Sequence, residues 1–166
     1  NAQRMEIEQK LAETWGLKDT FVVPTPPAIE DVNETVAQAA AMYMSDRISE
    51  NCFINMGYGD TPSRILNHLA TISQFPVSVV SLTGGVSYYL PNIQSHIFNA
   101  KLYLLPAPLL VSSKEMVAAM REEPSVSEIF RMVRLASMTL VGIGGMSDEA
   151  TIIKNGILSK NDFLYL

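Results

Sequence analysis

Two glycine-bearing segments of this chain contain the residue types that bind an anion. The first is Gly57-Tyr58-Gly59-Asp60-Thr61 and the second is Thr83-Gly84-Gly85-Val86. Each follows a short apolar run and precedes a segment of helical character, so each predicts a turn from a strand into a helix. Backbone N–H groups at a helix N-terminus lack intrahelical partners and carry partial positive charge, which suits a phosphate. Together the two turns indicate a small phosphorylated ligand.

Asp60 is the residue of the first turn whose charge opposes this chemistry. Its carboxylate would repel a phosphate unless the side chain turns away from it. Asp60 could instead cap the helix or accept hydrogen bonds from sugar hydroxyls, and Pro62 suits the first helical position. The alternative for this loop alone is a tight turn whose glycines serve only a positive φ.

A third glycine segment, residues 142–147, matches a dinucleotide-binding fingerprint only in part. Ser147 stands where the third glycine is needed, and the acidic residue about twenty positions further on would be Asp162, close to the chain end. The chain also has no GxxxxGK[ST] phosphate loop. We therefore predict no nicotinamide or other cofactor, and keep Gly142 and Gly144 as candidate ligand-binding residues.

Metal and acid–base chemistry find little support in the sequence. His68 and His96 lie in apolar helical segments without a cysteine or second histidine at ligand spacing, so no metal site is expected. Cys52, the single cysteine, is predicted to be buried in a strand and excludes an intrachain disulfide. An enzyme would have Asp60, His96 and Asp148 as its candidate acids and bases. None of them has an evident partner, so no catalytic residue is predicted.

The composition bounds the function further. The chain has 166 residues, 17 acidic against 12 basic, and a net charge of -5, which fits one globular domain without a basic surface for nucleic acid. No apolar run is long enough to span a bilayer, and the N-terminus lacks the apolar core of a signal peptide. These features predict a cytoplasmic protein with no membrane partner.

The elements that must position the turns alternate along the chain. Nearly continuous apolar strands separated by helices imply an α/β fold, with a mostly parallel, Rossmann-like sheet covered by helices on both faces. Ligands bind such sheets beyond the carboxyl ends of the strands, so all three glycine segments are expected at one edge. Helices are predicted at Met5–Trp15, Val32–Ile48, Pro62–Ile72, Pro91–Ala100, Ser113–Arg121, Val126–Leu135 and Asp148–Lys154; strands are predicted at Phe21–Val23, Cys52–Met56, Val77–Leu82, Leu102–Leu105 and, with a glycine turn, Met138–Gly145.

Several segments are informative in their order and spacing: Leu11–Leu17 with Val22-Val23-Pro24, Gly57–Thr61, Ser81–Gly85, Leu105–Pro108 and Leu140–Gly144. Together they resemble the effector-binding domain of the SorC family of bacterial transcriptional regulators. The stretch Ala150–Gly156 is especially similar to the branch that represses autoinducer-2 uptake operons. The resemblance implies a fold like that of sugar-phosphate isomerases and deaminases, a phosphorylated sugar as effector, and no catalysis.

The resemblance also implies roles for individual residues and for parts outside this chain. Family members have a helix-turn-helix before this domain and a further segment after it. Residues 1–166 are therefore expected to form one effector-binding domain, incomplete at its C-terminus, that reaches DNA only through a missing N-terminal domain and forms a homo-oligomer, a dimer or tetramer. The predicted ligand-binding residues are Gly57, Gly59, Asp60, Thr61, Thr83, Gly84, Gly85, Val86, Gly142 and Gly144.

Two other functions remain open at this point. The chain could be an enzyme of the same sugar-phosphate class, an isomerase or a deaminase. It could also be an oligomerisation or interaction module, in which case the glycine turns would bind no ligand and substitutions at Gly84 and Gly85 would alter stability only.

Overall fold

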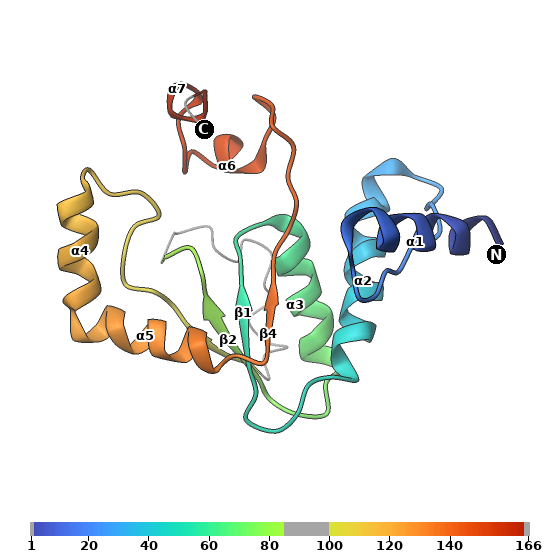
Figure 1. Cartoon of the computed structure of the whole chain (residues 1–166), viewed down its shortest axis with the longest axis horizontal. Helices are drawn as coiled ribbons and strands as arrows, with labels where there is room; N and C mark the ends of the chain where they lie inside the picture. Colours follow the sequence, from blue (N-terminus) through green and yellow to red (C-terminus); the bar gives the residue numbers. More distant parts are fainter. Residues whose placement is uncertain (1, 85–99, 165–166) are drawn as a thin grey trace.

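Four parallel strands form the sheet of this protein. The computed structural model describes residues 2–84 and 100–164, and the predicted helix Pro91–Ala100 falls outside them except for its last residue. The strand order is β3-β2-β1-β4 (Figure 1). This confirms the predicted α/β fold with a parallel sheet. The strands are β1 (Phe53–Met56), β2 (Val77–Ser81), β3 (Ala100–Tyr103) and β4 (Met138–Leu140).

Successive strands are added on one side of β1 up to β3, and β4 is then added on the other side of β1. Helix α3 (Asp60–Ile72) connects β1 to β2, and the chain then reaches β3 further out on the same side. Helices α4 (Lys114–Glu122) and α5 (Pro124–Leu135) lead back to β4, which pairs with the opposite edge of β1. In parallel α/β sheets this reversal opens the crevice in which ligands bind, at the carboxyl ends of the strands.

Helix α3 covers one face of the sheet, and α2 (Val32–Ser45) packs beside α3 (Figure 1). Ile54 and Met56 of β1 point to this face, where they join Leu66 and Leu69 in one apolar cluster. Alternation along a strand puts every second side chain on one face, which explains this set. Ala37 and Ala41 of α2 belong to the same cluster and are fully buried.

The opposite face is covered by α5. Asn55 points this way: its Nδ2 donates to the Val133 carbonyl oxygen at 3.0 Å and to Thr139 Oγ1 at 3.3 Å. Val126 and Ile129 are the buried residues of α5. Helices therefore cover both faces of the sheet, as predicted.

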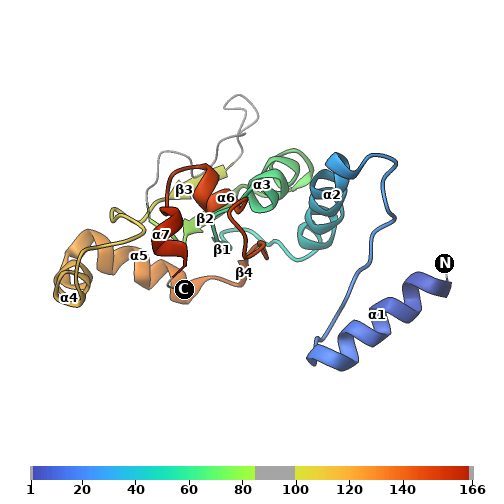
Figure 2. The ribbon, with the colours of Figure 1, turned by 90° about the horizontal axis from the view of Figure 1, so that it is seen from above.

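The N-terminal region differs from its prediction. Helix α1 (Ala2–Trp15) forms as expected but has no buried residue, and Figure 2 shows it set apart from the sheet. The predicted strand Phe21–Val23 is wrong, because these residues pair with no strand. The amide of Val22 donates instead to Glu8 Oε1 at 2.7 Å. A strand needs a ladder partner, and β-branched residues alone do not provide one. The chain continues through a 3₁₀ turn, η1 (Ile29–Asp31), into α2.

The segment after β4 is also more open than predicted. The expected buried strand Met138–Gly145 stops at Leu140, and Ile143 beyond it is completely exposed. Helix α6 (Thr151–Lys154) begins later than the predicted Asp148, because a turn from Ser147 to Ala150 precedes it. Helix α7 (Lys160–Phe163) follows. Within residues 2–84 and 100–164, no helix is both long and apolar enough to cross a membrane.

Candidate effector site

The ends of three neighbouring strands bring the glycine turns together. The amide of Leu82, just after β2, donates to the Met56 carbonyl oxygen at the end of β1, at 3.0 Å. On the other side of β1, the amide of Gly57 donates to the Leu140 carbonyl oxygen at 2.8 Å. The first turn therefore lies between the second turn and the start of the third glycine segment, at the carboxyl edge where the sequence predicted them.

The first turn delivers the chain into α3 through Gly59. Gly59 has φ +152° and ψ 162°, a backbone conformation essentially restricted to glycine. Asp60 and Thr61 are the first two residues of α3, so Pro62 occupies the third helical position. The prediction that Pro62 is the first helical residue is therefore wrong. The amides of Asp60 and Thr61 occupy positions without an intrahelical acceptor, and Pro62 has no N–H. These amides are the donors that the helix terminus can direct at an anion.

The third glycine segment contributes Gly142 to this region. A Cβ built on Gly142 would lie 3.4 Å from Pro62 Cδ, so the chain after β4 runs against the first turn of α3. Nothing lies within 4 Å of the corresponding position at Gly144, which is exposed. The structure thus brings Gly57, Gly59 and Gly142 together and leaves Gly144 outside this contact.

The carboxylate of Asp60 is engaged by neighbouring side chains. Its Oδ2 accepts hydrogen bonds from Arg64 Nε at 2.8 Å and from Asn33 Nδ2 at 3.1 Å. Arg64 Nη1 also contacts Glu34 Oε2 at 2.9 Å, and Glu34 Oε1 lies 2.6 Å from His68 Nε2. Hydrogen bonds from Arg64 and then His68 hold the pKa of Glu34 below its usual range. Bonds to Asp60 and then Glu34 raise the pKa of Arg64.

The second turn is held by the hydroxyl of Ser81 and by close packing against the backbone of Ala107. Ser81 Oγ donates to the Gly84 carbonyl oxygen at 3.2 Å and accepts from the Thr83 amide at 3.4 Å. Gly84 has φ +79°, and a Cβ there would lie only 2.2 Å from the Ala107 carbonyl oxygen. Thr83 Oγ1 is buried and has no hydrogen-bond partner in the described part of the chain. A buried hydroxyl without a hydrogen-bond partner is uncommon, so this group could form a hydrogen bond with a ligand. Gly85 and Val86 lie outside the described residues.

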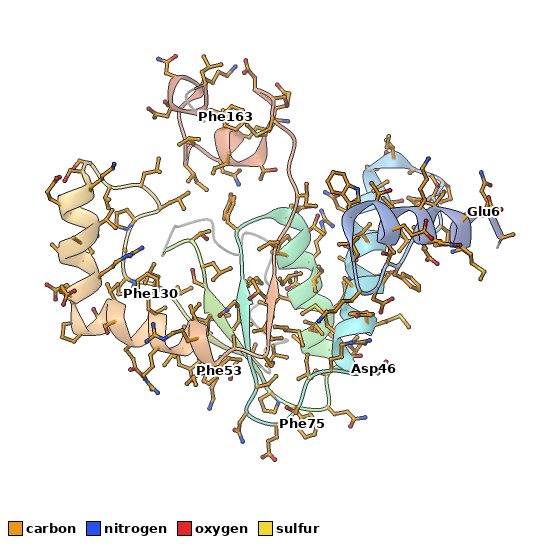
Figure 3. All side chains as sticks on the ribbon, in the orientation of Figure 1. Glu6, Asp46, Phe53, Phe75, Phe130 and Phe163 are labelled. Carbon is orange, nitrogen blue, oxygen red and sulfur yellow. The ribbon has the colours of Figure 1, made fainter. Side chains whose placement is uncertain are left out.

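A C-terminal segment lies over the same edge. Asn155 Nδ2 donates to the hydroxyl of Tyr58 in the first turn. Figure 1 shows α6 and α7 beyond the carboxyl ends of the strands, and Figure 3 shows Phe163 of α7 at the opposite end of the sheet from Phe75, which precedes β2. Leu158 in this segment is buried. A polar contact between Asn155 and Tyr58 therefore joins the C-terminal segment to the first turn.

A cavity of about 540 Å³ lies elsewhere, between residues 19–23, α2 and β4. None of the predicted ligand-binding residues lines it. Its lining is mostly apolar, and its one guanidinium, that of Arg47, is stacked 3.6 Å above the Tyr43 ring. Thr20, Tyr43 and Thr139 are among its lining residues, but among the residues that the structure describes no glycine turn and no helix N-terminus is.

Neither metal binding nor acid–base catalysis gains support from the geometry. Across the residues that the structure describes, no group of three or more His, Cys, Asp or Glu side chains could hold a metal ion. Of the three candidates for an enzyme, Asp60 is bound by Arg64, and Asp148 is exposed with Lys160 Nζ 3.3 Å from its carboxylate. His96 lies outside the described residues.

The Sugar-bind family, whose description is "putative sugar-binding domain", matches residues 1–166. The chain belongs to this family. It is 30% identical to the transcriptional regulator LsrR of Klebsiella pneumoniae, over 96% of this chain and 50% of that protein. It is 28% identical to LsrR of Escherichia coli K12, over 87% of this chain and 46% of that protein. The chain thus spans about half the length of the curated relatives it matches.

Solved structures agree on the fold. The full-length sorbitol operon regulator SorC from Klebsiella pneumoniae superposes with a TM-score of 0.74 at 21% identity, over 96% of this chain and 56% of that one. A DeoR family transcriptional regulator from Listeria monocytogenes gives 0.78 at 24% identity, over 99% and 68%. At these identities the likeness shows the fold alone. The predicted resemblance to a regulator's sugar-binding domain is confirmed by the Sugar-bind family and by the relatives named as transcriptional regulators.

Sequence reasoning missed the side chains that surround Asp60. Residues 60, 64 and 68 recur every fourth position on one side of α3, which is a readable signal for paired charges on a helix. Glu34 and Asn33 come from another helix, and no local pattern connects them to α3. The contact between Asn155 and Tyr58 could not be predicted either, because the two residues lie far apart in the sequence.

Proposed function

We propose that this chain is the effector-binding part of a bacterial transcriptional regulator and that it binds a phosphorylated sugar at the carboxyl edge of the sheet. The observation that carries the proposal is the meeting of two glycine turns beside the β1–β4 switch point, one of which opens a helix. Membership of the Sugar-bind family supports a sugar ligand. The names of the curated relatives support a role in transcription.

The phosphate would lie against the first turn of α3. The amides of Asp60 and Thr61 and the hydroxyl of Thr61 would donate to its oxygens, and the glycines would let the ligand approach the backbone closely. A helix terminus contributes only about 0.3–1 kcal/mol to binding a surface anion. Further donors are therefore needed, and Thr83 Oγ1 is a buried hydroxyl available for one of them. The proposed contact residues are Gly57, Gly59, Asp60 through its backbone amide, Thr61, Thr83, Gly84, Gly85, Val86 and Gly142. Gly144, which is exposed, would lie at the margin of the site.

Effector binding would act on DNA through another domain of the regulator. A ligand shifts an equilibrium only by its difference in affinity for the two states. The proposed regulator is a homo-oligomer, and the sugar phosphate would favour one of its assembly or packing states. DNA affinity would change with that state.

A thermal-shift screen of the intact protein tests this proposal. The probes are fructose 6-phosphate, ribose 5-phosphate, inorganic phosphate and the two parent sugars, each mixture being checked by NMR for chemical conversion. A phosphorylated sugar present at about 100 times its Kd should add about 2.7 kcal/mol of stability. The parent sugars should give much smaller shifts. Conversion of a probe would identify an enzyme, and no shift with any probe would overturn the proposal in favour of an interaction module.

A further inference from the structure

The proposed ligand and the side chain of Asp60 carry the same charge at the same helix terminus. Asp60 is the first residue of α3, where the phosphate is proposed to bind. Its side chain is 28% exposed, so the carboxylate is neither removed from water nor fully screened by it. Like charges this close weaken anion binding unless a cation compensates for them.

The structure supplies that cation one helical turn further along α3. Arg64 Nε bonds to Asp60 Oδ2 at 2.8 Å, while Asn33 Nδ2 donates to the same oxygen at 3.1 Å. Asn33 belongs to α2, so the two donors hold the Asp60 carboxylate in the direction of α2. The carboxylate that would repel a phosphate is thus already occupied.

Arg64 is itself held at a second point. Its Nη1 bonds to Glu34 Oε2 at 2.9 Å, and the other oxygen of Glu34 lies 2.6 Å from His68 Nε2. The guanidinium therefore contacts two carboxylates through two different nitrogens, which fixes both its position and its plane. A lysine ammonium could not reproduce this two-point geometry.

We propose that Arg64 is a positioning residue of the effector site: it pairs with Asp60 and holds its carboxylate toward α2, so that the first turn of α3 can accept a phosphate. This inference rests on the proposed function. Arg64 acts through Asp60 and does not itself contact the ligand. If Arg64 acts on the Asp60 charge, removing that charge should make Arg64 dispensable for binding. If Arg64 only supports the fold, it should be needed whether or not Asp60 is charged.

The test combines Arg64→Gln, Asp60→Asn and the double variant in the intact protein. Titration calorimetry measures affinity for whichever of fructose 6-phosphate, ribose 5-phosphate and inorganic phosphate stabilise the wild-type protein. Arg64→Gln should weaken binding of the phosphorylated probe about tenfold, with a smaller effect on the parent sugar. The double variant should return to within about threefold of wild type, because the repelling charge is gone. Asp60→Asn alone keeps the backbone amide that is proposed to bind the phosphate and removes only the side-chain charge, so it should bind at least as tightly as wild type.

A matched control comes from α5, where Arg131 Nη2 contacts Glu128 Oε1 at 2.6 Å. Arg131→Gln removes a helical ion pair distant from the turns and should leave the affinity unchanged. Equal affinity in wild type and Arg64→Gln would overturn the inference while the proposed function stands. If the double variant binds the phosphorylated probe as weakly as Arg64→Gln does, Arg64 contacts the ligand directly and the inference is wrong. If Asp60→Asn loses affinity, the Asp60 carboxylate contacts the ligand directly and the inference is also wrong. No binding to the wild-type protein would instead overturn the proposed function. Where Arg64→Gln does not fold, Arg64→Lys takes its place: it keeps the charge but cannot hold both carboxylates, so it should also weaken binding, and only while Asp60 is present.

Discussion

The two glycine turns lie side by side at one edge of the sheet and are built in different ways. The Gly57–Thr61 turn opens a helix and is surrounded by side chains that carry charge, among them Arg64 and Glu34. The Thr83–Gly84 turn, among the residues that the structure describes, forms hydrogen bonds with a hydroxyl and backbone groups, and its backbone lies close to Ala107. Similar sequence patterns therefore form a charged, adjustable loop and a tightly packed one. We expect the first to be tuned by electrostatics and the second by sterics.

The largest expected effect is that of Gly84→Ala on stability. The new Cβ would lie 2.2 Å from the Ala107 carbonyl oxygen, and φ +79° is itself strained for alanine. The Ala107 carbonyl belongs to the backbone and cannot move without distorting the chain. We therefore expect the free energy of unfolding, measured in urea, to fall by about 2–4 kcal/mol. Gly144→Ala, in open space, should change stability by less than about 0.5 kcal/mol. Equal stability in the two variants would show that the second turn is not tightly packed.

Gly59→Ala should cost less, although Gly59 also has a positive φ. The closest atom to its built Cβ is Pro62 Cδ at 3.2 Å, a side-chain atom that can give by a few tenths of an ångström. The cost is then mainly the strained backbone, about 1–2 kcal/mol in the same unfolding experiment. Gly57→Ala has ordinary contacts of 3.4 Å and more and serves as the control, with a smaller loss. A loss for Gly59→Ala as large as that for Gly84→Ala would contradict the contrast between the two turns.

Thr83→Val separates ligand binding from stability in the second turn. Valine matches the shape of threonine and removes a buried hydroxyl that has no partner in the described part of the chain, so the ligand-free protein should keep its stability. Affinity for a phosphorylated sugar should fall about tenfold in calorimetry if that hydroxyl bonds to the ligand. Thr14→Val in α1 is a suitable control for the loss of a hydroxyl. An unchanged affinity in Thr83→Val would remove the second turn from the proposed site.

Glu34→Gln should have the smallest effect, and the effect should depend on pH. Because the pKa of folded Glu34 lies below its ordinary value of 4.5, the carboxylate contributes stability above that pH, and the contribution is lost as pH falls through the folded pKa. The side chain is 36% exposed, so the difference between wild type and variant at pH 7 should stay below about 1 kcal/mol. Thermal unfolding from pH 3 to pH 7 measures it. A difference that grows toward low pH would contradict the assignment of the charged form.

Much of the fold could be predicted because its signals are local. The apolar runs ending at Met56 and Leu82 and the helical periodicity after Pro62 were enough to predict β1, β2 and α3. The segments that failed, Phe21–Val23 and the residues after Leu140, have strand-like composition. Their structure depends on whether another strand pairs with them, and no local pattern contains that information.

The candidate site divides in the same way. The sequence by itself determined the glycines and the helix that follows the first turn. It also determined the position of both turns at one sheet edge, because parallel strands joined by helices end at the same edge whatever their order. Only the tertiary structure decided that the charge of Asp60 is paired, that Gly84 lies against Ala107 and that Asn155 reaches Tyr58. These contacts join residues distant in the chain, and their energies exist only when packing brings the atoms within reach.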